Sequence, residues 1–328
     1  MKVEIASLGR LTHLNTGGEG IVYKCSKYPD KAFKHYKKEV EHEIDLVALE
    51  KSVQIFHALP SGERPYFEER TAWPETIVTE AGIAVGFLMP LLKDEMYCEY
   101  RAVTEDSAIT QLREWQFLAY RKHWKNPNIV TNLQEPSKKQ LLELIIDFSK
   151  TVELMHQHQL VIGDISFRNI LWCTEGYLKT VLIDCDGIRH EGLRGPLAAK
   201  QTPDWIDLDR QTGSTDRMTD LFKLGLANYR GYFGAGAGYP SDAQPPDLST
   251  EADQAVFELS KRAVLSQAKP TATDWVSTLG PILQKTHQGI IDSDGRTTVD
   301  RPEDARVKTR VTTLLPPRPI FQKPTTGN

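Results

Sequence analysis

The most constraining feature of the chain is a pair of acidic loops that lie close together in the sequence. The first reads Val161-Ile-Gly-Asp-Ile-Ser-Phe-Arg-Asn-Ile-Leu171, and the second reads Val181-Leu-Ile-Asp-Cys-Asp-Gly187. Asn169 follows Asp164 by five residues, and two short apolar runs joined by a turn then lead to Asp184. Carboxylate and amide oxygens are the ligands that Mg²⁺ prefers. The pattern predicts a magnesium site on Asn169 and Asp184, with Asp164 beside it to accept or orient a hydroxyl proton.

A glycine-rich strand–turn–strand precedes these loops. Residues Leu14 to Tyr23 read Leu-Asn-Thr-Gly-Gly-Glu-Gly-Ile-Val-Tyr. Glycines such as Gly17 and Gly20 let backbone amides approach a phosphate without a Cβ clash, and Val22 is placed to cover an adenine. No Lys-Ser or Lys-Thr follows, so the loop is not of the Walker A type. By itself this hairpin is equally compatible with a plain turn.

Lys34 ends a predicted strand just beyond the glycine loop. A lysine in this place reaches the α- and β-phosphates of ATP when a carboxylate on the next helix holds it. Glu43 and Glu50 both qualify, because they share nearly the same face of one amphipathic helix predicted over residues 38–58. We prefer Glu50, because the sixteen residues after Lys34 allow a loop and about two helical turns.

Hydrophobic periodicity predicts the remaining elements. Strands are expected at Leu11 to Leu14, Ile21 to Cys25, Lys31 to Tyr36, Thr76 to Glu80, Ala84 to Met89, Asn169 to Trp172 and Thr180 to Ile183. Helices are expected at Lys139 to His156, Thr219 to Tyr229 and Glu251 to Ser266. The chain therefore begins with strands and continues mainly with helices.

In this order along the chain, the motifs resemble the protein-kinase superfamily to about residue 283. More narrowly, they are similar to atypical bacterial kinases whose catalytic loop reads Gly-Asp-x-x-x-x-Asn and whose metal loop reads Ile-Asp-x-Asp. Ala72-Trp-Pro74 and Gly86-Phe-Leu-Met-Pro90 also resemble those enzymes. Asp220 matches the buried aspartate that braces the catalytic loop in kinases, and Lys269 to Trp275 resembles their closing segment.

The resemblance implies an α+β, bilobal protein-kinase-like fold with ATP in the cleft. Residues 1–92 would form a small antiparallel β N-lobe with one long helix. Residues 93–283 would form a larger, mainly helical C-lobe that carries a helical insert at about 93–136. Residues 284–328 are rich in Pro and Thr and are predicted to form an extended tail.

The resemblance also implies a role for each motif residue. Asp164 would act on the acceptor hydroxyl, Lys34 on the phosphates, and Asn169 and Asp184 on Mg²⁺ or Mn²⁺. Arg168 would supply the positive charge that Ser/Thr kinases usually carry at the position of Ser166, although a surface arginine is an equal reading. Met89 would be the gatekeeper, and Pro90 to Leu92 the hinge. The residues expected to contact ATP are Asn15, Gly17, Gly18, Gly20, Val22, Ala32, Lys34, Glu50, Met89, Pro90, Leu92 and Leu171. Asp186, which replaces a glycine of the kinase motif, either adds a metal contact or caps a turn.

The implied reaction transfers the γ-phosphoryl group of ATP to Ser or Thr of a protein substrate, with autophosphorylation of the Thr-rich tail as a corollary. Two alternatives stay open. One is a small-molecule phosphotransferase of the aminoglycoside-kinase-like type, with its acceptor pocket in residues 93–136. The other is a nucleotide-binding pseudokinase that acts as a scaffold. Because related bacterial kinases are encoded beside PP2C-type phosphatases and von Willebrand A-domain proteins, both are candidate partners.

Composition limits the class of protein further. Lys+Arg 40 against Asp+Glu 44 gives a net charge of −4, which argues against a dedicated nucleic-acid binder. The four cysteines stand far apart without a C-x-x-C pair and read as reduced thiols. Apolar windows such as Ile83 to Leu92 are too short to span a bilayer. We expect a cytoplasmic protein without a membrane or nucleic-acid partner.

Overall fold

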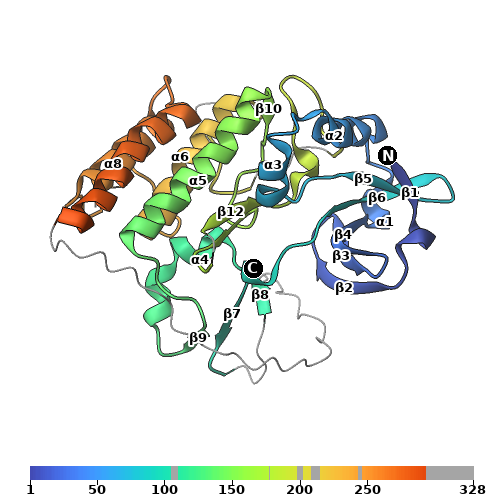
Figure 1. Ribbon diagram of the computed structural model, residues 1–328, viewed down its shortest axis with the longest axis horizontal. Coiled ribbons are helices and arrows are strands. Elements are labelled where there is room, and N and C mark those ends of the chain that lie inside the picture. The colour runs from blue at the N-terminus through green and yellow to red at the C-terminus, as the bar shows by residue number, and fades with distance from the viewer. Residues whose placement is uncertain (105–109, 177, 198–201, 208–214, 243–245, 293–328) are drawn as a thin grey trace, which may run out of the picture. The chain divides into compact units, whose positions relative to one another are not determined.

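The computed structural model describes residues 1–292 except 105–109, 177, 198–201, 208–214 and 243–245. The chain divides into two compact units, Met1–Gln288 and Gly289–Asn328. The first unit is a mixed α+β structure in which a mostly antiparallel sheet comes first and helices follow (Figure 1). Of the second unit, only the end of one helix is described.

Six strands form the N-terminal sheet in the order β1-β5-β6-β4-β3-β2. Strand β1 pairs with β5 in parallel, and all other neighbours in this sheet are antiparallel. The strands are β1 (Lys2–Glu4), β2 (Leu11–Thr16), β3 (Gly20–Cys25), β4 (Tyr28–Tyr36), β5 (Thr76–Glu80) and β6 (Ile83–Pro90). The five strands predicted in this region are confirmed, and β1 was not predicted.

Side chains alternate between the two faces of a strand, and each face of this sheet carries a buried apolar cluster. One face carries a cluster of Leu8, Cys25, Phe33, Val78, Val85 and Leu88. On the other face, Ile77 and Phe87 pack with Leu49 and Val53 of helix α2 (Leu46–Ala58). The segment after β4 lies beside the glycine loop, because the Lys37 N–H donates to the Glu19 carbonyl oxygen at 2.9 Å.

The prediction of one helix over residues 38–58 is wrong. The structure divides this segment into α1 (Lys38–Glu41) and α2, with Asp45 as the N-cap of α2. The Asp45 side chain accepts from the Ala48 N–H at 3.0 Å, and the Asp45 N–H donates to the carbonyl oxygen of Pro196 at 2.7 Å. An N-cap residue has a non-helical backbone, so the helix has to begin again at this point. A further helix, α3 (Arg64–Arg70), precedes β5.

The prediction of a helical insert at residues 93–136 is also wrong. This region contains a three-stranded sheet of β7 (Tyr97–Ala102), β8 (Thr110–Leu112) and β9 (Ile129–Thr131), together with the short helix α4 (Trp115–Ala119) and two 3₁₀ turns, Asp94–Met96 and Arg121–Lys125. The aromatic residues of the insert serve the core. Trp115 is fully buried, and the ring centroids of Tyr100 and Phe117 are 4.8 Å apart.

The second half of the first unit is built on long helices, α5 (Lys138–Gln157), α6 (Arg217–Phe233), α7 (Glu251–Leu265) and α8 (Ala272–Asp292). The three predicted helices are confirmed, and α8 was not predicted. Helix α6 is central, since its residues 219–232 are all buried. Gly225 lets α6 lie against α7, because a Cβ there would lie 2.2 Å from the Cβ of Ala263. Residues 284–292 are helical, which corrects the start of the expected extended tail, and residues 293–328 lie outside the described part of the chain.

Two short antiparallel strand pairs lie between α5 and α6 in the sequence. Strand β10 (Leu160–Val161) pairs with β13 (Arg189–His190), and β11 (Ile170–Cys173) pairs with β12 (Lys179–Leu182). The β11–β12 hairpin confirms the two strands predicted beside the acidic loops. A hydrogen bond of 3.0 Å from the Ile183 N–H to the Asn169 carbonyl oxygen holds the two loops next to each other.

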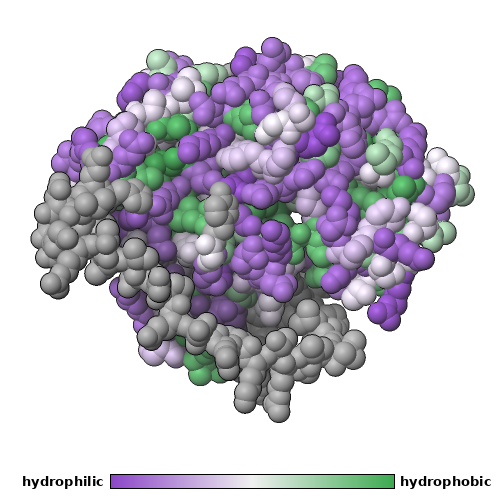
Figure 2. Space-filling model, in the orientation of Figure 1, coloured by the Kyte–Doolittle hydropathy of each residue, from purple (hydrophilic) through white to green (hydrophobic). Residues whose placement is uncertain are grey.

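The face in Figure 2 is mostly hydrophilic, and hydrophobic side chains show on it in separate patches. Large apolar side chains that are exposed include Val47 and Ile83. Within the described ranges, no helix combines the length and apolar character needed to cross a membrane.

Candidate functional site

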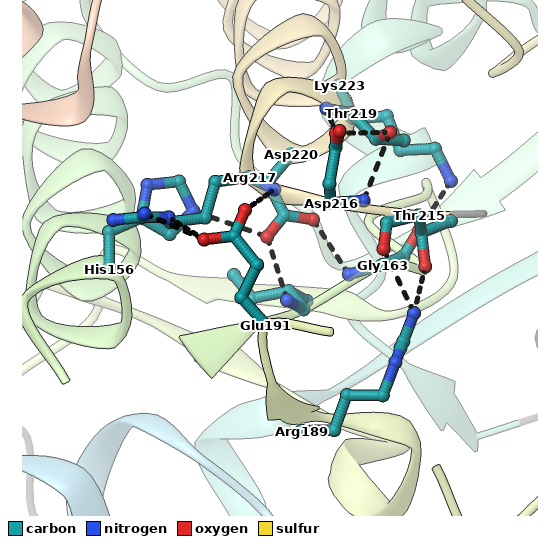
Figure 3. Close-up of polar contacts among 11 residues, drawn as sticks. His156, Gly163, Arg189, Glu191, Thr215, Asp216, Arg217, Thr219, Asp220 and Lys223 are labelled. Atoms are coloured by element: carbon teal, nitrogen blue, oxygen red, sulfur yellow. Dashed lines mark hydrogen bonds and ion pairs between the residues drawn. The ribbon is translucent and has the colours of Figure 1, made fainter. Parts of the chain in front are cut away.

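The loop at residues 162–169 is held in place by helix α6 (Figure 3). The fully buried Asp220 carboxylate accepts from the backbone N–H of Ile162 at 2.8 Å and of Gly163 at 2.7 Å. His156 lies 3.2 Å from the same carboxylate. The expected brace between Asp220 and this loop is therefore confirmed.

Asp164 presents its carboxylate at the top of this loop. Its Oδ2 atom accepts from the side-chain nitrogen of Asn169 at 2.9 Å, and its Oδ1 atom accepts from the Thr202 hydroxyl at 2.9 Å. Asn169 also donates to the Asp164 carbonyl oxygen, so its amide nitrogen is used within the loop and only its amide oxygen is left as a metal ligand. The contact with Thr202 was not predicted. It shows that an aliphatic hydroxyl fits within hydrogen-bond distance of Asp164.

Lys34 of β4 meets the second acidic loop, where Asp186 is nearly buried and Asp184 is exposed to solvent. Its Nζ atom lies 2.5 Å from Asp184 Oδ1, and 2.8 and 2.9 Å from the two carboxylate oxygens of Asp186. The Tyr36 hydroxyl donates to Asp186 at 2.8 Å, and Glu19 lies 3.9 Å from Lys34. The sheet of the first strands and the loop after β12 are thus joined by one network of charges.

The charges of this cluster act in opposite directions: burial raises the pKa of Asp186, and the opposing charge of Lys34 does not outweigh it. Burial would lower the pKa of Lys34, but the carboxylates of Asp186 and Asp184 outweigh it and raise the pKa above its ordinary value. The pKa of Tyr36 is also raised, first by burial and then by the negative charge of Asp186. Lys34 is therefore a cation and Tyr36 a neutral hydrogen-bond donor throughout the physiological range.

The same cluster offers a candidate cation site. Glu19, Asp184 and Asp186 each place one carboxylate oxygen within 4.8 Å of the others. Three carboxylates form a hard-oxygen donor set that fits Mg²⁺ or Mn²⁺. Asp184, one predicted ligand, is part of this acidic group, and the other predicted ligand, Asn169, accepts through its backbone carbonyl oxygen from the N–H of the adjacent Ile183. Glu19 was missed, and the available signal was its position inside the glycine loop.

The expected pairing of Glu50 with Lys34 is not found. Glu50 instead lies 2.8 Å from Lys2 of β1, and both side chains are largely solvent-exposed. The alternative partner, Glu43, is exposed and lies 3.8 Å from His42. The break at Asp45 explains both results, because the prediction placed the two glutamates on one continuous helix.

The glycine loop forms the predicted hairpin of β2 and β3. The Gly17 N–H donates to the Gly20 carbonyl oxygen at 2.8 Å, and a Cβ on Gly20 would lie 2.8 Å from the His35 carbonyl oxygen. An added Cβ on Gly18 would meet no atom within 4 Å. Asn15 follows a β-bulge and pairs with Val22 across the hairpin. Only Gly20 is thus required to be glycine by close packing.

Some of the remaining residues expected to contact ATP lie on β3, β4 and β6 of the N-terminal sheet, and the others lie in or near the cluster that contains Leu171. Val22 pairs with Lys34 across β3 and β4, and Ala32 pairs with Met89 across β4 and β6. Pro90 ends β6 opposite Lys31, and the next N–H, that of Leu91, donates to the Asp30 carbonyl oxygen at 2.9 Å. Further on, Leu92 packs against a cluster that contains the fully buried Leu171. Arg168 is exposed to solvent.

The segment that carries Thr202 is anchored by two buried cations. Lys269 lies 3.1 Å from Asp207, and both side chains are nearly buried. Arg230 of α6 is fully buried, donates to the Asp204 carbonyl oxygen at 3.1 Å, and has its guanidinium carbon 4.9 Å from the Trp205 ring centroid. Neither anchor was predicted from the sequence.

Comparison with known proteins adds no relative. No model of a protein family matches the chain, and no curated protein matches it.

Proposed function

We propose that this chain is an ATP- and Mg²⁺-dependent protein kinase with a bilobal fold, which transfers the γ-phosphoryl group to Ser or Thr of a protein substrate. In this proposal, residues 1–92 are the N-lobe and residues 93–283 the C-lobe. One observation carries it: Lys34 of the sheet that bears the glycine loop meets Asp184, whose neighbour Ile183 is bonded to Asn169 of the Asp164 loop. The sheet that bears the glycine loop thus converges with the two acidic loops, which lie far from it in the sequence.

Each group has a defined task in this reaction. Lys34 binds the phosphates of ATP after it leaves the carboxylates that now surround it, and the glycine loop covers them. Asp164 orients the acceptor hydroxyl, and its contact with the Thr202 hydroxyl supports this task. Mg²⁺, held by Asp184 together with Glu19, Asp186 or Asn169, would neutralise phosphate charge. Catalysis then rests on positioning and electrostatic stabilisation.

The experiment is phosphoamino-acid analysis of purified protein incubated with Mg²⁺ and γ-labelled ATP, alone and with dephosphorylated casein as a generic acceptor. We expect phosphoserine or phosphothreonine. Asp164→Ala should keep ATP binding but lower transfer by about 10²–10⁴-fold, while Asp247→Ala, at an exposed loop position, should not. Phosphate transfer only to a small hydroxyl compound, or no transfer by the wild type, would overturn the proposal.

A further inference from the structure

A buried lysine lies directly behind the Asp164 loop, on helix α6. Lys223 is 2% exposed, and its Nζ atom donates to the carbonyl oxygen of Gly163 at 2.7 Å. It follows Asp220 by three residues, so the two side chains leave the same face of α6 (Figure 3). None of the tasks described above uses this cation.

Asp220 and Lys223 together bind both polar backbone groups of Gly163. The Asp220 carboxylate accepts from the Gly163 N–H, and the Lys223 ammonium donates to the Gly163 carbonyl. Gly163 has a φ of 77°, and a Cβ at this position would lie 2.9 Å from the Thr215 hydroxyl oxygen. The two peptide groups on either side of Gly163 are therefore each held by one residue of α6, and Gly163 keeps a conformation that favours glycine.

A neutral donor would suffice for the hydrogen bond to Gly163, so the ammonium group needs its own explanation. Burying an ammonium costs several kcal/mol unless carboxylates compensate for it. Burial lowers the pKa of Lys223, and the negative charges of Asp164 and then Asp220 oppose this effect. The carboxylate proposed to orient the acceptor thus offsets part of the cost of burying the Lys223 charge.

The loop itself holds no buried cation of its own. Within residues 160–170, all of which the structure describes, Arg168 is the one cationic side chain, and it is exposed. Ser166 is nearly buried at 4% exposure, but it is neutral. Lys223 reaches the loop from helix α6 and supplies a positive charge beside Asp164.

We propose that Lys223 is a positioning residue for Asp164: it fixes the Gly163 carbonyl group, while Asp220 fixes the Gly163 N–H, and it places a positive charge near the Asp164 carboxylate. The proposal rests on the proposed kinase function for its catalytic consequence. The second part of the proposal, an electrostatic attraction between Lys223 and Asp164, does not depend on the kinase function.

The activity test compares three substitutions that separate the hydrogen bond from the charge. Lys223→Gln keeps a donor for Gly163 without the charge, Lys223→Met removes both, and Lys223→Arg keeps the charge. With casein as acceptor, we expect Gln and Met to lower kcat by about 10- to 100-fold, the range for a slightly misplaced catalytic group, with KM for ATP unchanged within about twofold. Arg should recover part of kcat. Wild-type kcat in the Gln variant would overturn the proposal.

A double-mutant cycle tests the attraction without any activity. Urea denaturation is measured for the wild type, Lys223→Gln, Asp164→Asn and the double variant. We expect Lys223→Gln to lower the urea midpoint clearly less in the Asp164→Asn background than in the wild type, because the attraction is already absent there. The matched control is Lys179→Gln, a similarly buried lysine that pairs with Glu95 at 3.0 Å, and it should be additive with Asp164→Asn.

Failure of the proposed kinase function and failure of the Lys223 positioning role give different results. If the wild type transfers no phosphate, the proposed function falls, and the cycle still decides whether Lys223 acts on Asp164. If Lys223→Gln and Asp164→Asn are additive, the positioning role is overturned whether or not the chain transfers phosphate.

Discussion

The Nζ atom of Lys34 lies 2.8 Å from Oδ1 of Asp186, a residue that follows it by 152 positions. This ion pair ties β4 of the N-terminal sheet to the loop after β12, and both side chains are nearly buried. The Tyr36 hydroxyl adds a hydrogen bond to the same carboxylate. The pair is therefore a structural link as well as part of the candidate site.

Removing the Lys34 ammonium group from this pair should lower the free energy of unfolding. Lys34→Met leaves the Asp186 carboxylate buried without its main counter-charge, and breaking a buried pair in this way costs about 3–5 kcal/mol. Urea denaturation at neutral pH measures the loss. The control is Lys2→Met, which removes the exposed pair with Glu50 and should cost less than about 1 kcal/mol. Equal losses in the two variants would show that the Lys34 pair contributes no more than a surface contact.

The three carboxylates around Lys34 should bind a divalent cation. Titration with Mn²⁺, followed by electron paramagnetic resonance of the free ion, measures the affinity in the presence of ATP. We expect Glu19→Gln to weaken Mn²⁺ binding at least about tenfold, because even groups that only orient metal ligands are worth about 10–100-fold. Glu80→Gln, an exposed change at the end of β5, is the matched control. Unchanged Mn²⁺ affinity in Glu19→Gln would remove Glu19 from the site.

The position of Lys34 also depends on a glycine in the neighbouring strand. A Cβ on Gly86 would lie 2.0 Å from the Lys34 carbonyl oxygen and 2.8 Å from the ring of Phe33. Gly86→Ala therefore has to displace the backbone of β4, and we expect a loss of about 1–3 kcal/mol or more. Phosphate transfer should fall with it, because Lys34 moves.

Gly62→Ala is the control for this substitution, since an added Cβ at Gly62 would meet no atom within 4 Å. Its stability should stay within about 0.5 kcal/mol of the wild type. Thermal denaturation of both variants makes the comparison. A Gly86→Ala protein as stable as Gly62→Ala would mean that β4 and β6 separate without cost.

Local sequence signals were sufficient for the elements around the site. Short runs typical of β-strands, next to a Gly-rich turn, predicted β3 and β4, and two apolar runs around Gly176, which has a φ of 68°, predicted the β11–β12 hairpin. The brace from Asp220 was predicted by resemblance and is confirmed. The strands and the hairpin depend on a few neighbouring residues, so a sequence can specify them, whereas the brace joins residues 58 positions apart and was found only through the resemblance.

The partners of Lys34 depend on tertiary contacts and could not be predicted from local sequence signals. The choice between Glu43 and Glu50 assumed a continuous helix, but the N–H of Asp45 donates to Pro196, about 150 residues further along the chain. Asp186 was recognised as unusual, but nothing in the sequence specified that it would face Lys34. Likewise, Lys223 is indistinguishable in sequence from a solvated lysine of a helix.

Asp253 provides a test of the helical half that depends on pH. Its carboxylate is 1% exposed and accepts from Lys138 at 2.7 Å, from the Thr250 N–H at 3.0 Å and from the Tyr232 hydroxyl at 3.0 Å. Burial raises the pKa of Asp253, but the hydrogen bonds from Lys138 and Thr250 outweigh it and hold the pKa below its usual value. A depressed pKa in the folded state contributes stability that is present above the unfolded pKa of about 3.9 and is lost as pH falls through the folded pKa. Asp253→Asn should therefore lower the free energy of unfolding by about 2 kcal/mol at pH 7 and by clearly less at about pH 3. Urea denaturation at both pH values measures the two losses, and the exposed-loop variant Asp247→Asn is the control. An equal loss at both pH values would show that the Asp253 charge does not stabilise the fold.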